Sequence, residues 1–340
     1  MSIDGRVQPI IGEAPAFLAM LEHVSRAAPL DKPVLVVGER GTGKEPIAAR
    51  LHFLSQRWEQ PLIKVNCAAL TESILESELF GHEAGAFTGA VKGHTGHFER
   101  ADGGTLVLDE LATISLRMQE KILRVIEYGE LQRVGGSDTL RVNVRIVGST
   151  NADLQERVRN GLFRDDLLDR LAFDVITLPP LRERLEDILP LAYAFAVNMV
   201  SELKLAYFPG FSSKASSSLL RHDWSGNVRE LKNAVERSVY RADEPEQPIK
   251  EIAFDPFDSP FRLRKEPARA GTVESPQAQK KRPLLPANLK ASLEETEKKF
   301  LQEALRKARF NQKVAAELLE LSYDQFRGRI RKHQLQLQAD

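Results

Sequence analysis

A glycine-rich segment that ends in a lysine lies near the start of the chain, in the order Gly38-Glu39-Arg40-Gly41-Thr42-Gly43-Lys44-Glu45. An apolar run at 34–37 precedes it and a helical pattern at 47–52 follows it, so we expect it to join a strand to a helix. Glycines let backbone N–H groups wrap around phosphate oxygens, the helix N-terminus adds positive charge, and Lys44 can reach the β- and γ-phosphates. The segment therefore predicts a nucleotide site. The alternative is a glycine-rich turn with a solvated lysine.

Two acidic residues at the end of another apolar run supply further groups that phosphoryl transfer needs. Asp109 and Glu110 follow the run 105–108. We expect Asp109 to hold Mg²⁺, directly or through water, and Glu110 to orient and polarise the attacking water. A helix N-cap made of surface acids is the alternative. Glu45 occupies the position where a Ser or Thr hydroxyl usually binds Mg²⁺, so that ligand is absent.

Phosphoryl transfer also benefits from positive charge beside the γ-phosphate, and two arginines six residues apart could supply it. Arg164 and Arg170 lie in an acidic helical pattern. An arginine donated by a neighbouring chain can raise the rate by about 10³ to 10⁵. The competing interpretation is that the arginines form ion pairs within their own helix, with Asp165, Asp166 and Asp169. The spacing leaves both interpretations open.

These groups need a scaffold, and the order of strand-like and helical patterns predicts one. Short β-branched runs alternate with amphipathic stretches, which indicates parallel strands joined by crossover helices. The expected strands are Val34–Val37, Leu62–Val65, Thr105–Leu108, Val144–Val147 and Val175–Leu178. From about residue 186 the pattern is helical and we expect no further strand, but helices at 187–204, 212–222 and 227–241.

A proline-rich stretch separates this region from a helical C-terminal region. Six of the chain's 18 prolines lie between residues 256 and 286, where helix cannot persist, so we interpret the stretch as an extended linker. Helical patterns return at 289–309 and 311–333, and the second is divided by a turn near 320–322. The side chains of this helix pair that we expect to face inward are Ala315, Leu318, Leu319, Phe326 and Ile330.

The chain has 340 residues with 48 basic and 48 acidic side chains, and this neutrality conceals two unlike parts. Residues 1–279 hold 34 basic and 40 acidic side chains, whereas residues 280–340 hold 14 and 8. The basic region is a candidate for contacts with nucleic-acid phosphates. No apolar run approaches the ~18 to 20 residues of a membrane span, the single cysteine excludes an intramolecular disulfide framework, and a signal-peptide pattern is absent. We therefore expect a cytoplasmic protein without a membrane span.

A motif of high specificity lies between the two predicted phosphate-binding elements, Gly85-Ala86-Phe87-Thr88-Gly89-Ala90. It resembles the GAFTGA loop of bacterial enhancer-binding proteins, the AAA+ activators of sigma-54 RNA polymerase; ordinary AAA+ proteins lack it. The resemblance runs from about residue 11 to 241 and continues through the C-terminal helices. Within the family, activators of the phage shock operon are the most similar. Further family motifs are readable at Gly104–Leu111, Gly129–Gly136, Ser149–Asn151, Leu181–Arg184 and Trp224–Leu231.

The resemblance implies a fold and its cofactors. The expected fold is an α/β AAA+ P-loop ATPase, a parallel sheet flanked by helices, with a small α-helical lid subdomain and a C-terminal all-α helix-turn-helix domain. The family uses ATP and Mg²⁺, and its arginines act across subunits, so a homo-oligomer is implied, a hexamer in the family. Glu45 is expected here, because the family loop commonly has the sequence GTGKE. The implied bounds are 1–185 for the α/β subdomain, 186–254 for the lid, 255–287 for the linker and 288–340 for the Fis-type domain.

The resemblance also implies roles for residues whose chemistry alone does not reveal them. Asn66 matches the residue that holds the catalytic glutamate in a switchable position. Thr150 and Asn151 match the sensor that reads the γ-phosphate. The two trans-acting arginine fingers and the second sensor, in the lid, match Arg164, Arg170 and Arg229.

The GAFTGA segment has the composition of a contact loop. Its glycines and alanines allow an exposed hairpin tip that presents Phe87 and Thr88 to a partner. From composition alone, a flexible surface loop with a partly buried Phe87 is favoured. The resemblance implies instead that residues 85–90 contact sigma-54, with the loop raised on ATP binding and withdrawn on hydrolysis.

The C-terminal helix pair resembles the Fis-type helix-turn-helix of the same activators, whose second helix suits the major groove of enhancer DNA. Glu320 replaces the usual turn glycine, and Gly328 lies inside the recognition helix at a cost of about 1 kcal/mol. A plain basic helical hairpin is the alternative. The residues expected to contact DNA are Gln325, Arg327, Arg329, Arg331 and Lys332.

Only 37 residues precede the phosphate loop, which leaves no room for a sensing domain upstream, so we expect control in trans. Relatives of the phage shock type are bound by a coiled-coil negative regulator, phage shock protein A. Trp58 ends a helical pattern amid polar residues and is a candidate anchor for such a regulator. Burial of Trp58 in the core is an equally good interpretation.

Three functions are compatible with these features. The first is an ATPase that activates transcription by remodelling the closed promoter complex of sigma-54 RNA polymerase, at the phage shock operon. The second is a nucleotide-responsive DNA-binding repressor without sigma-54 remodelling. The third, a protein-unfolding AAA+ chaperone, leaves the basic helix pair without a role. The intact segment Phe87-Thr88-Gly89 favours the first.

Overall fold

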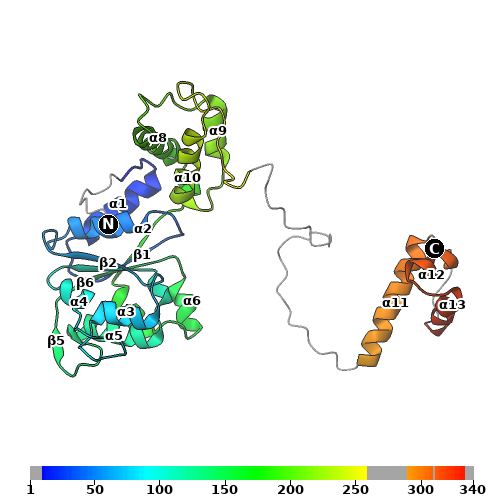
Figure 1. The fold of residues 1–340 in the computed structure, drawn as a ribbon, viewed down its shortest axis with the longest axis horizontal. Helices are drawn as coiled ribbons and strands as arrows, with labels where there is room; N and C mark the ends of the chain where they lie inside the picture. The colour runs from blue at the N-terminus through cyan, green and yellow to red at the C-terminus, as the bar shows by residue number, and fades with distance from the viewer. Residues whose placement is uncertain (1–9, 259–288, 309–310, 334–340) are drawn as a thin grey trace. The chain divides into compact units, whose positions relative to one another are not determined.

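The computed structural model describes residues 10–258, 289–308 and 311–333. The chain divides near residue 262 into two compact units (Figure 1). Each unit has hydrophobic core residues of its own. Residues 259–287 of the predicted linker lie outside the described residues. The predicted domain bounds therefore stay predictions, and the two units are described separately below.

A five-stranded parallel sheet forms the centre of the first unit, in the order β2-β3-β6-β1-β7. All five predicted strands are present, with ends displaced by up to three residues: β1 Val34–Val37, β2 Leu62–Asn66, β3 Thr105–Asp109, β6 Arg145–Thr150 and β7 Asp174–Thr177. In a parallel sheet the carboxyl ends of all strands lie at one edge. The loops after β1, β2, β3 and β6 therefore come together at that edge.

Helices cover both faces of the sheet, so its strands are apolar on both sides. Successive side chains of β1 alternate between the faces, and Val34 and Val36 point to one face while Leu35 points to the other. The first face is covered by α1 (Pro15–Ala27) and α2 (Lys44–Phe53). The second face is covered by α3 (Glu72–Phe80), α5 (Leu116–Tyr128) and α7 (Asp165–Leu171), which completes a three-layer arrangement (Figure 1).

The sequence patterns did not predict several short elements. An antiparallel hairpin of β4 (Glu130–Gln132) and β5 (Thr139–Arg141) follows α5. Its strands have three residues each, which is too short for an alternating pattern to stand out. The hairpin loop supports the GAFTGA segment, because the Val134 N–H donates to the Gly81 carbonyl at 2.9 Å. The other short elements are α4 (His97–Arg100), the 3₁₀ turn η1 (Leu111–Thr113) and α6 (Leu154–Arg159).

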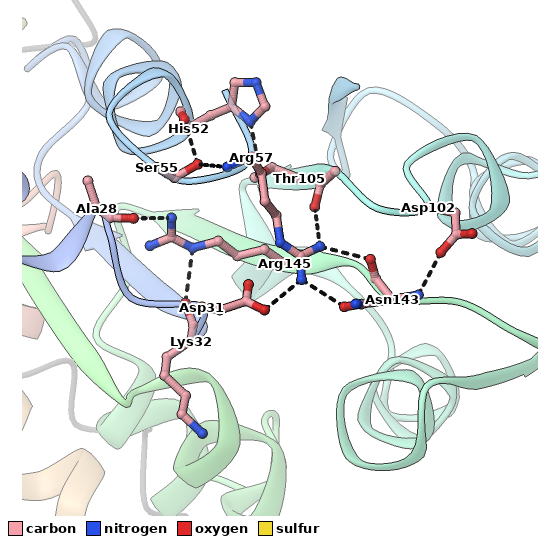
Figure 2. Close-up of polar contacts among 11 residues, drawn as sticks. Ala28, Asp31, Lys32, His52, Ser55, Arg57, Asp102, Thr105, Asn143 and Arg145 are labelled. Atoms are coloured by element: carbon pink, nitrogen blue, oxygen red, sulfur yellow. Dashed lines mark hydrogen bonds and ion pairs between the residues drawn. The ribbon is translucent and has the colours of Figure 1, made fainter. Parts of the chain in front are cut away.

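A buried arginine holds the amino-terminal edge of the sheet against the end of α1. Arg145, the first residue of β6, donates to the carbonyl oxygens of Ala28 at 2.7 Å and Lys32 at 3.2 Å (Figure 2). It also donates to the Ala27 carbonyl at 3.1 Å. Burial lowers the pKa of Arg145, but the backbone carbonyls satisfy its donors, which makes a buried guanidinium tolerable. This edge is opposite the one that carries the phosphate loop.

After β7, the described part of the first unit forms no further strand, and its three long helices lie within two residues of the predicted bounds. They pack around Trp224, which is fully buried and donates its indole N–H to the Leu219 carbonyl at 2.8 Å. This helical lid consists of η2 (Leu181–Glu183), α8 (Leu185–Glu202), α9 (Ser213–Arg221) and α10 (Asn227–Tyr240).

The second unit is a three-helix domain of α11 (Leu289–Lys307), α12 (Gln312–Leu318) and α13 (Tyr323–Lys332). Ser322 and Gln325 form a capping box at the start of α13, which fixes where the second predicted helix begins. The prediction that Leu318 faces inward is wrong: it is 53% exposed. Ala316, the residue after the inward-facing Ala315, is buried in its place, because the core is shared with α11.

Candidate functional site

The phosphate loop joins β1 to α2, as the sequence predicts. Gly41 and Gly43 have left-handed backbone with φ of 78° and 100°, which explains the need for glycine there. Lys44 is the first residue of α2 and its side chain folds back over the loop, donating to the carbonyls of Gly38 at 2.9 Å and Glu39 at 3.1 Å. Burial lowers the pKa of Lys44, while the nearby carboxylates of Asp109 and Glu110 act in the opposite direction.

The two predicted carboxylates lie at the same edge of the sheet as the loop. Asp109 is the last residue of β3 and accepts a hydrogen bond from the Ser149 hydroxyl on the neighbouring strand. Glu110 follows it with a left-handed φ of 53°. In the amide orientation that satisfies both of its neighbours, Asn151 donates to Glu110 Oε2 at 3.0 Å and accepts from Arg40 Nε at 3.2 Å. Asn151 therefore links the carboxylate to the phosphate loop.

Asn66 and Thr150 occupy equivalent positions at the ends of their strands. Asn66 pairs in register with Asp109, and Thr150 with Val37. The Asn66 side chain accepts the Ala68 N–H at 2.9 Å, so in this structure the residue that faces Glu110 is Asn151. Thr150 is buried, and its hydroxyl oxygen accepts the Ala152 N–H at 3.1 Å.

A cleft of about 870 Å³ lies between the phosphate loop and the lid. The phosphate loop, both carboxylates and two lid helices line it, and Arg229 projects from α10 on the lid side. Its backbone N–H donates to the Gly41 carbonyl at 3.3 Å. The site residues that the cleft brings together are Arg40, Gly41, Gly43, Lys44, Glu45, Asp109, Glu110 and Arg229.

A smaller apolar pocket of about 150 Å³ shares Gly43 with the cleft. Sequence reasoning missed it as a site, because its lining comes from segments that lie far apart along the chain. Arg184 closes one side, with its guanidinium carbon 3.5 Å from the centre of the Phe17 ring and its Nε donating to the buried Asp187 at 2.7 Å. A flat apolar ligand group fits this pocket. Its apolar lining is Ile10, Ile11, Phe17, Pro46, Ile47, Leu191, Phe195 and Val228.

The lid is attached to the phosphate loop by residues that also escaped sequence reasoning. Asn227 is fully buried with a left-handed φ of 55°. Its amide donates to Glu39 Oε2 at 3.0 Å and to the Arg40 carbonyl at 3.1 Å, and it accepts the Leu181 N–H at 2.8 Å. Arg182 pairs with both carboxylate oxygens of Glu39 at 2.9 and 2.6 Å. The only sequence signal was that both lie in recognised motifs.

The oxygen donors at this edge fit Mg²⁺, which prefers one or two carboxylates together with substrate phosphates and water. Asp109 has one carboxylate oxygen engaged by Ser149, and both it and Glu110 line the cleft. Glu45 does not add a donor here, because its carboxylate pairs with Lys64 at 2.9 Å. Asp109 would therefore hold the ion without the usual hydroxyl.

Neither predicted finger arginine lines this cleft. Arg164 is the N-cap of α7 and forms a bidentate pair with Asp166, one of the partners that the local ion-pair interpretation names. For Arg170 that interpretation is wrong, because its partner at 2.9 Å is Glu127 on α5. Although it is paired with Glu127, the side chain of Arg170 is 60% exposed.

The GAFTGA segment forms a tight loop on a short bridge between His82 and His94. Gly85 and Gly89 have φ of 84° and 103°, and a Cβ on either would meet no atom within 4 Å. Phe87 is 49% exposed and its ring makes an edge contact with His82, with ring centres 4.9 Å apart. Thr88 is exposed, whereas Ala90 at the base is buried.

The basic residues of α13, the helix expected to contact DNA, fall into two groups. Glu297 on α11 accepts from Arg329 at 2.9 Å and pairs with Lys332 at 3.4 Å, and His333 lies 2.9 Å from the same carboxylate. Hydrogen bonding to His333 is the largest cause that lowers the pKa of Glu297. Arg327 and Arg331 are exposed and pair with none of the described residues. Gln325, predicted to contact DNA, is engaged in the capping box.

Trp58 is 56% exposed, so the interpretation that it is buried in the core is wrong. It lies in the turn between α2 and β2, and Phe53 and Leu54 near the end of α2 are also exposed.

Among the residues that the structure describes, no helix combines the length and the apolar character that a membrane span requires.

Comparison with known families matches three successive regions. Residues 10–177 match the Sigma-54 interaction domain, residues 182–263 the AAA+ ATPase lid domain, and residues 292–333 the Fis family of bacterial regulatory proteins. The matched regions coincide with the sheet, the lid and the three-helix domain.

Individual relatives give the same assignment. The Psp operon transcriptional activator of Escherichia coli K12 is 58% identical over 326 residues, 96% of this chain and 98% of that protein. The Nif-specific regulatory protein of Klebsiella pneumoniae is 43% identical over 95% of this chain and 58% of its own length. The structure of NtrX from Brucella abortus in complex with ATP aligns with a TM-score of 0.67 and 29% identity over 96% of this chain and 70% of that chain. The chain therefore belongs to the sigma-54-dependent transcriptional activators, AAA+ proteins with a nucleotide-binding domain, a lid and a Fis-type DNA-binding domain.

Proposed function

We propose that this protein hydrolyses ATP to activate sigma-54 RNA polymerase at a psp operon, and that it uses the GAFTGA loop to remodel the closed promoter complex. The observation that carries the proposal is one cleft in which Lys44, Asp109 and Glu110 meet, in the same unit as an exposed GAFTGA loop. The Escherichia coli relative named for the psp operon supports the choice of operon.

The cleft suits phosphoryl transfer to water. Lys44 now contacts the carbonyls of Gly38 and Glu39, and it turns from them to the β- and γ-phosphates when ATP enters. Glu110 orients the attacking water, and Asn151 fixes the carboxylate that does so. When bound by Asp109, Mg²⁺ supplies positive charge that neutralises the phosphate oxygens. Thr150 senses the γ-phosphate from β6, and Asn66 offers Glu110 an alternative partner.

The adenine base occupies the apolar pocket beside Gly43. Ile10, Ile11 and Val228 line it, and all its apolar walls favour a flat ring over water. Arg229 approaches the phosphates from the lid. The lid therefore contacts both ends of the nucleotide, so its position depends on occupancy.

Arg170, which is exposed, and the half-buried Arg164 act in the active site of a neighbouring subunit. They do not line their own cleft, and Glu127 and Asp166 hold them until a partner docks. This arrangement requires a homo-oligomer, and we propose a hexamer, the ring that the family resemblance implies.

The loop and ATP turnover are tested by in vitro transcription with sigma-54 RNA polymerase, supercoiled promoter DNA and ATP. Phe87→Ala should retain ATPase activity and lose sigma-54 binding and open complexes, because Phe87 is the exposed aromatic of the loop. The matched control is Val91→Ala, which removes a more exposed apolar side chain one residue beyond the motif and should activate normally. Full activation by the Phe87 variant would overturn the role of the loop. If wild-type protein represses and never activates, the repressor function replaces the proposal.

The same activator binds enhancer DNA through α13. Arg327 and Arg331 are the basic residues of that helix that stay unpaired among the described residues, so they are the cations available to DNA. Arg327→Ala should weaken enhancer binding in a titration at fixed salt and leave ATPase activity unchanged. Equal affinity of variant and wild type would remove Arg327 from the interface.

A negative regulator in trans, phage shock protein A or its counterpart, docks on Trp58. The turn that carries Trp58 is firmly held: Arg57 donates to the carbonyls of Gly104 and Asn143 at 2.9 and 2.8 Å and pairs with Asp31 at 2.7 Å (Figure 2). A large apolar side chain on a rigid support is what an interface anchor requires.

The anchor is tested by measuring regulator affinity and inhibition of ATPase activity. Trp58→Ala should lose both, whereas Tyr240→Ala, which removes a more exposed aromatic on the lid, should keep both. Unchanged affinity of the Trp58 variant would place the regulator elsewhere.

A further inference from the structure

Gly328 lies at the centre of the outward face of α13. It follows the buried Phe326 by two residues and precedes the buried Ile330 by two. Each residue turns an α-helix by about 100°, so a residue two positions from both core side chains points away from the core. The exposed surface of α13 therefore has no side chain at its middle.

The fold itself gives no reason for this glycine. A Cβ on Gly328 would meet no atom within 4 Å, and its φ is not in the left-handed region. Elsewhere the fold does demand glycine: a Cβ on Gly41 would lie 2.2 Å from the Gly226 carbonyl, and one on Gly104 would lie 2.1 Å from that of Pro61. Glycine is also the poorest helix former after proline, so it weakens α13. A residue that costs helix stability without a structural gain points to a functional site.

The surroundings of Gly328 identify the chemistry of the partner. Arg327 and Arg331, which lie one turn apart, are on one side of Gly328 on the outward face of α13. Both are unpaired among the described residues. On the other flank, Arg329 and Lys332 are drawn towards Glu297 of α11. The described helix carries four basic side chains against the single acid Asp324. Its charge complements duplex DNA.

We propose that Gly328 is the point at which α13 approaches the base pairs most closely, and that its missing side chain sets the depth of the helix in the major groove. Without a Cβ, the backbone can lie directly against the base edges, while Arg327 and Arg331 reach bases and phosphates beside it. A methyl group at position 328 would hold the helix outward and weaken the contacts to the base edges on both sides, while the flexible arginines still reach the phosphates. Gly328 thus determines specificity because it has no side chain to keep the helix away from the bases. The inference rests on the proposed DNA reading by α13.

The test compares specific with non-specific affinity in the full-length protein. A duplex is first selected from a random-sequence library by the wild-type protein, and mixed-sequence genomic DNA serves as the second probe. At fixed salt, Gly328→Ala should bind the selected duplex about 10-fold more weakly or worse, Gly328→Val more weakly still, and both should keep wild-type affinity for the mixed DNA. Amide hydrogen exchange in 323–332 should slow in Gly328→Ala, because alanine strengthens the helix.

Binding of the selected duplex by Gly328→Ala with wild-type affinity would overturn the inference. So would equal weakening on both DNAs with faster exchange in α13, since the glycine would then act through folding. Arg331→Ala tests the underlying function separately. If Arg331→Ala loses affinity and Gly328→Ala does not, α13 reads DNA and only the inference on Gly328 fails. If neither variant loses affinity, α13 is not the reader. Lys307→Ala on α11 removes one basic residue away from α13 and should match the wild type on both probes.

Discussion

Two residues of the nucleotide site hold a left-handed backbone although they are not glycines. Glu110 has φ of 53° and Asn227 has φ of 55°. For a residue with a Cβ this conformation costs about 1 to 2 kcal/mol. Asn227 offsets that cost by three hydrogen bonds that link the lid, η2 and the phosphate loop. Its side chain thus fixes the geometry of the site rather than the chemistry.

Replacing Asn227 should disturb both stability and nucleotide binding. Asn227→Ala leaves the Leu181 N–H and the Arg40 carbonyl without their partner, so we expect a loss of about 2 kcal/mol or more in the free energy of unfolding and a raised KM for ATP. Urea unfolding and steady-state kinetics measure the two effects. Asn233→Ala, an exposed asparagine on the same helix, should change stability by less than about 0.5 kcal/mol. Equal unfolding midpoints for the two variants would contradict the role of Asn227.

We expect the single cysteine, Cys67, to be unreactive toward alkylating reagents in the native protein. Burial, and then the charges of Asp109 and Glu110, raise the pKa of the Cys67 thiol to about 12, so the reactive thiolate is scarce at neutral pH. We expect iodoacetamide at pH 8 to leave Cys67 unmodified in the folded protein and to modify it fully in 6 M guanidinium, read by mass spectrometry. Rapid native labelling would show that the end of β2 opens.

At the scale of elements, the lid and the phosphate loop are joined by an ion pair. Arg182 next to Glu39, with help from Asn227, lowers the pKa of the Glu39 carboxyl from 4.5 to about 2. A carboxyl with a depressed pKa stabilises the folded state above its ordinary pKa, and that contribution disappears as the pH falls towards the folded-state value. The pair therefore joins lid and loop firmly at neutral pH and weakly in acid.

Glu39→Gln removes this dependence. The urea midpoint of wild type should exceed that of Glu39→Gln above pH 4.5, and the difference should shrink steadily between pH 4.5 and 2. Glu251→Gln, which loses an exposed pair with Lys214 outside the cleft lining, should leave the KM for ATP unchanged, whereas Glu39→Gln should raise it. A pH-independent difference for Glu39→Gln would show that the pair does not hold the lid.

The sequence predicts elements well where a pattern is long and local. Hydrophobic periodicity predicts the five strands of the sheet and the helices of the lid and the three-helix domain, because burial on one or two faces dictates the residue types. The hairpin of β4 and β5 was missed because three-residue strands carry no period. The contacts of Asn227, Arg182 and Ile10 were missed for a different reason: they join segments more than a hundred residues apart, and only the folded chain brings those together. Leu318 was misplaced because α11 changes which face of α12 is inward.

At the scale of the whole molecule, the site is incomplete within one chain if Arg170 acts on a neighbour. A head-to-tail ring places the exposed arginine of one subunit at the cleft of the next. Lys44 and Asp109 would then belong to one side of each active site, and Arg170 to the other. This division can be tested without a structure of the ring.

Mixing inactive variants should restore activity only when their defects lie on opposite sides. Lys44→Ala and Arg170→Ala should each hydrolyse ATP poorly, while an equimolar mixture should regain up to about a quarter of wild-type activity, since half of the clefts and half of the arginines are intact. A mixture of Lys44→Ala with Asp109→Asn should regain nothing, because both defects lie in the same cleft. Recovery in neither mixture would place Arg170 outside the reaction.

The division of labour within α13 has a practical consequence for protein engineering. Phe326, Ile330 and the residues held by Glu297 anchor the helix, whereas positions 327, 328 and 331 face outward and take no part in the core. If α13 contacts DNA as proposed, these three positions can be randomised as a library while the anchors stay fixed. Variants selected from such a library would have new DNA-binding specificities and would direct the same ATPase to promoters of choice.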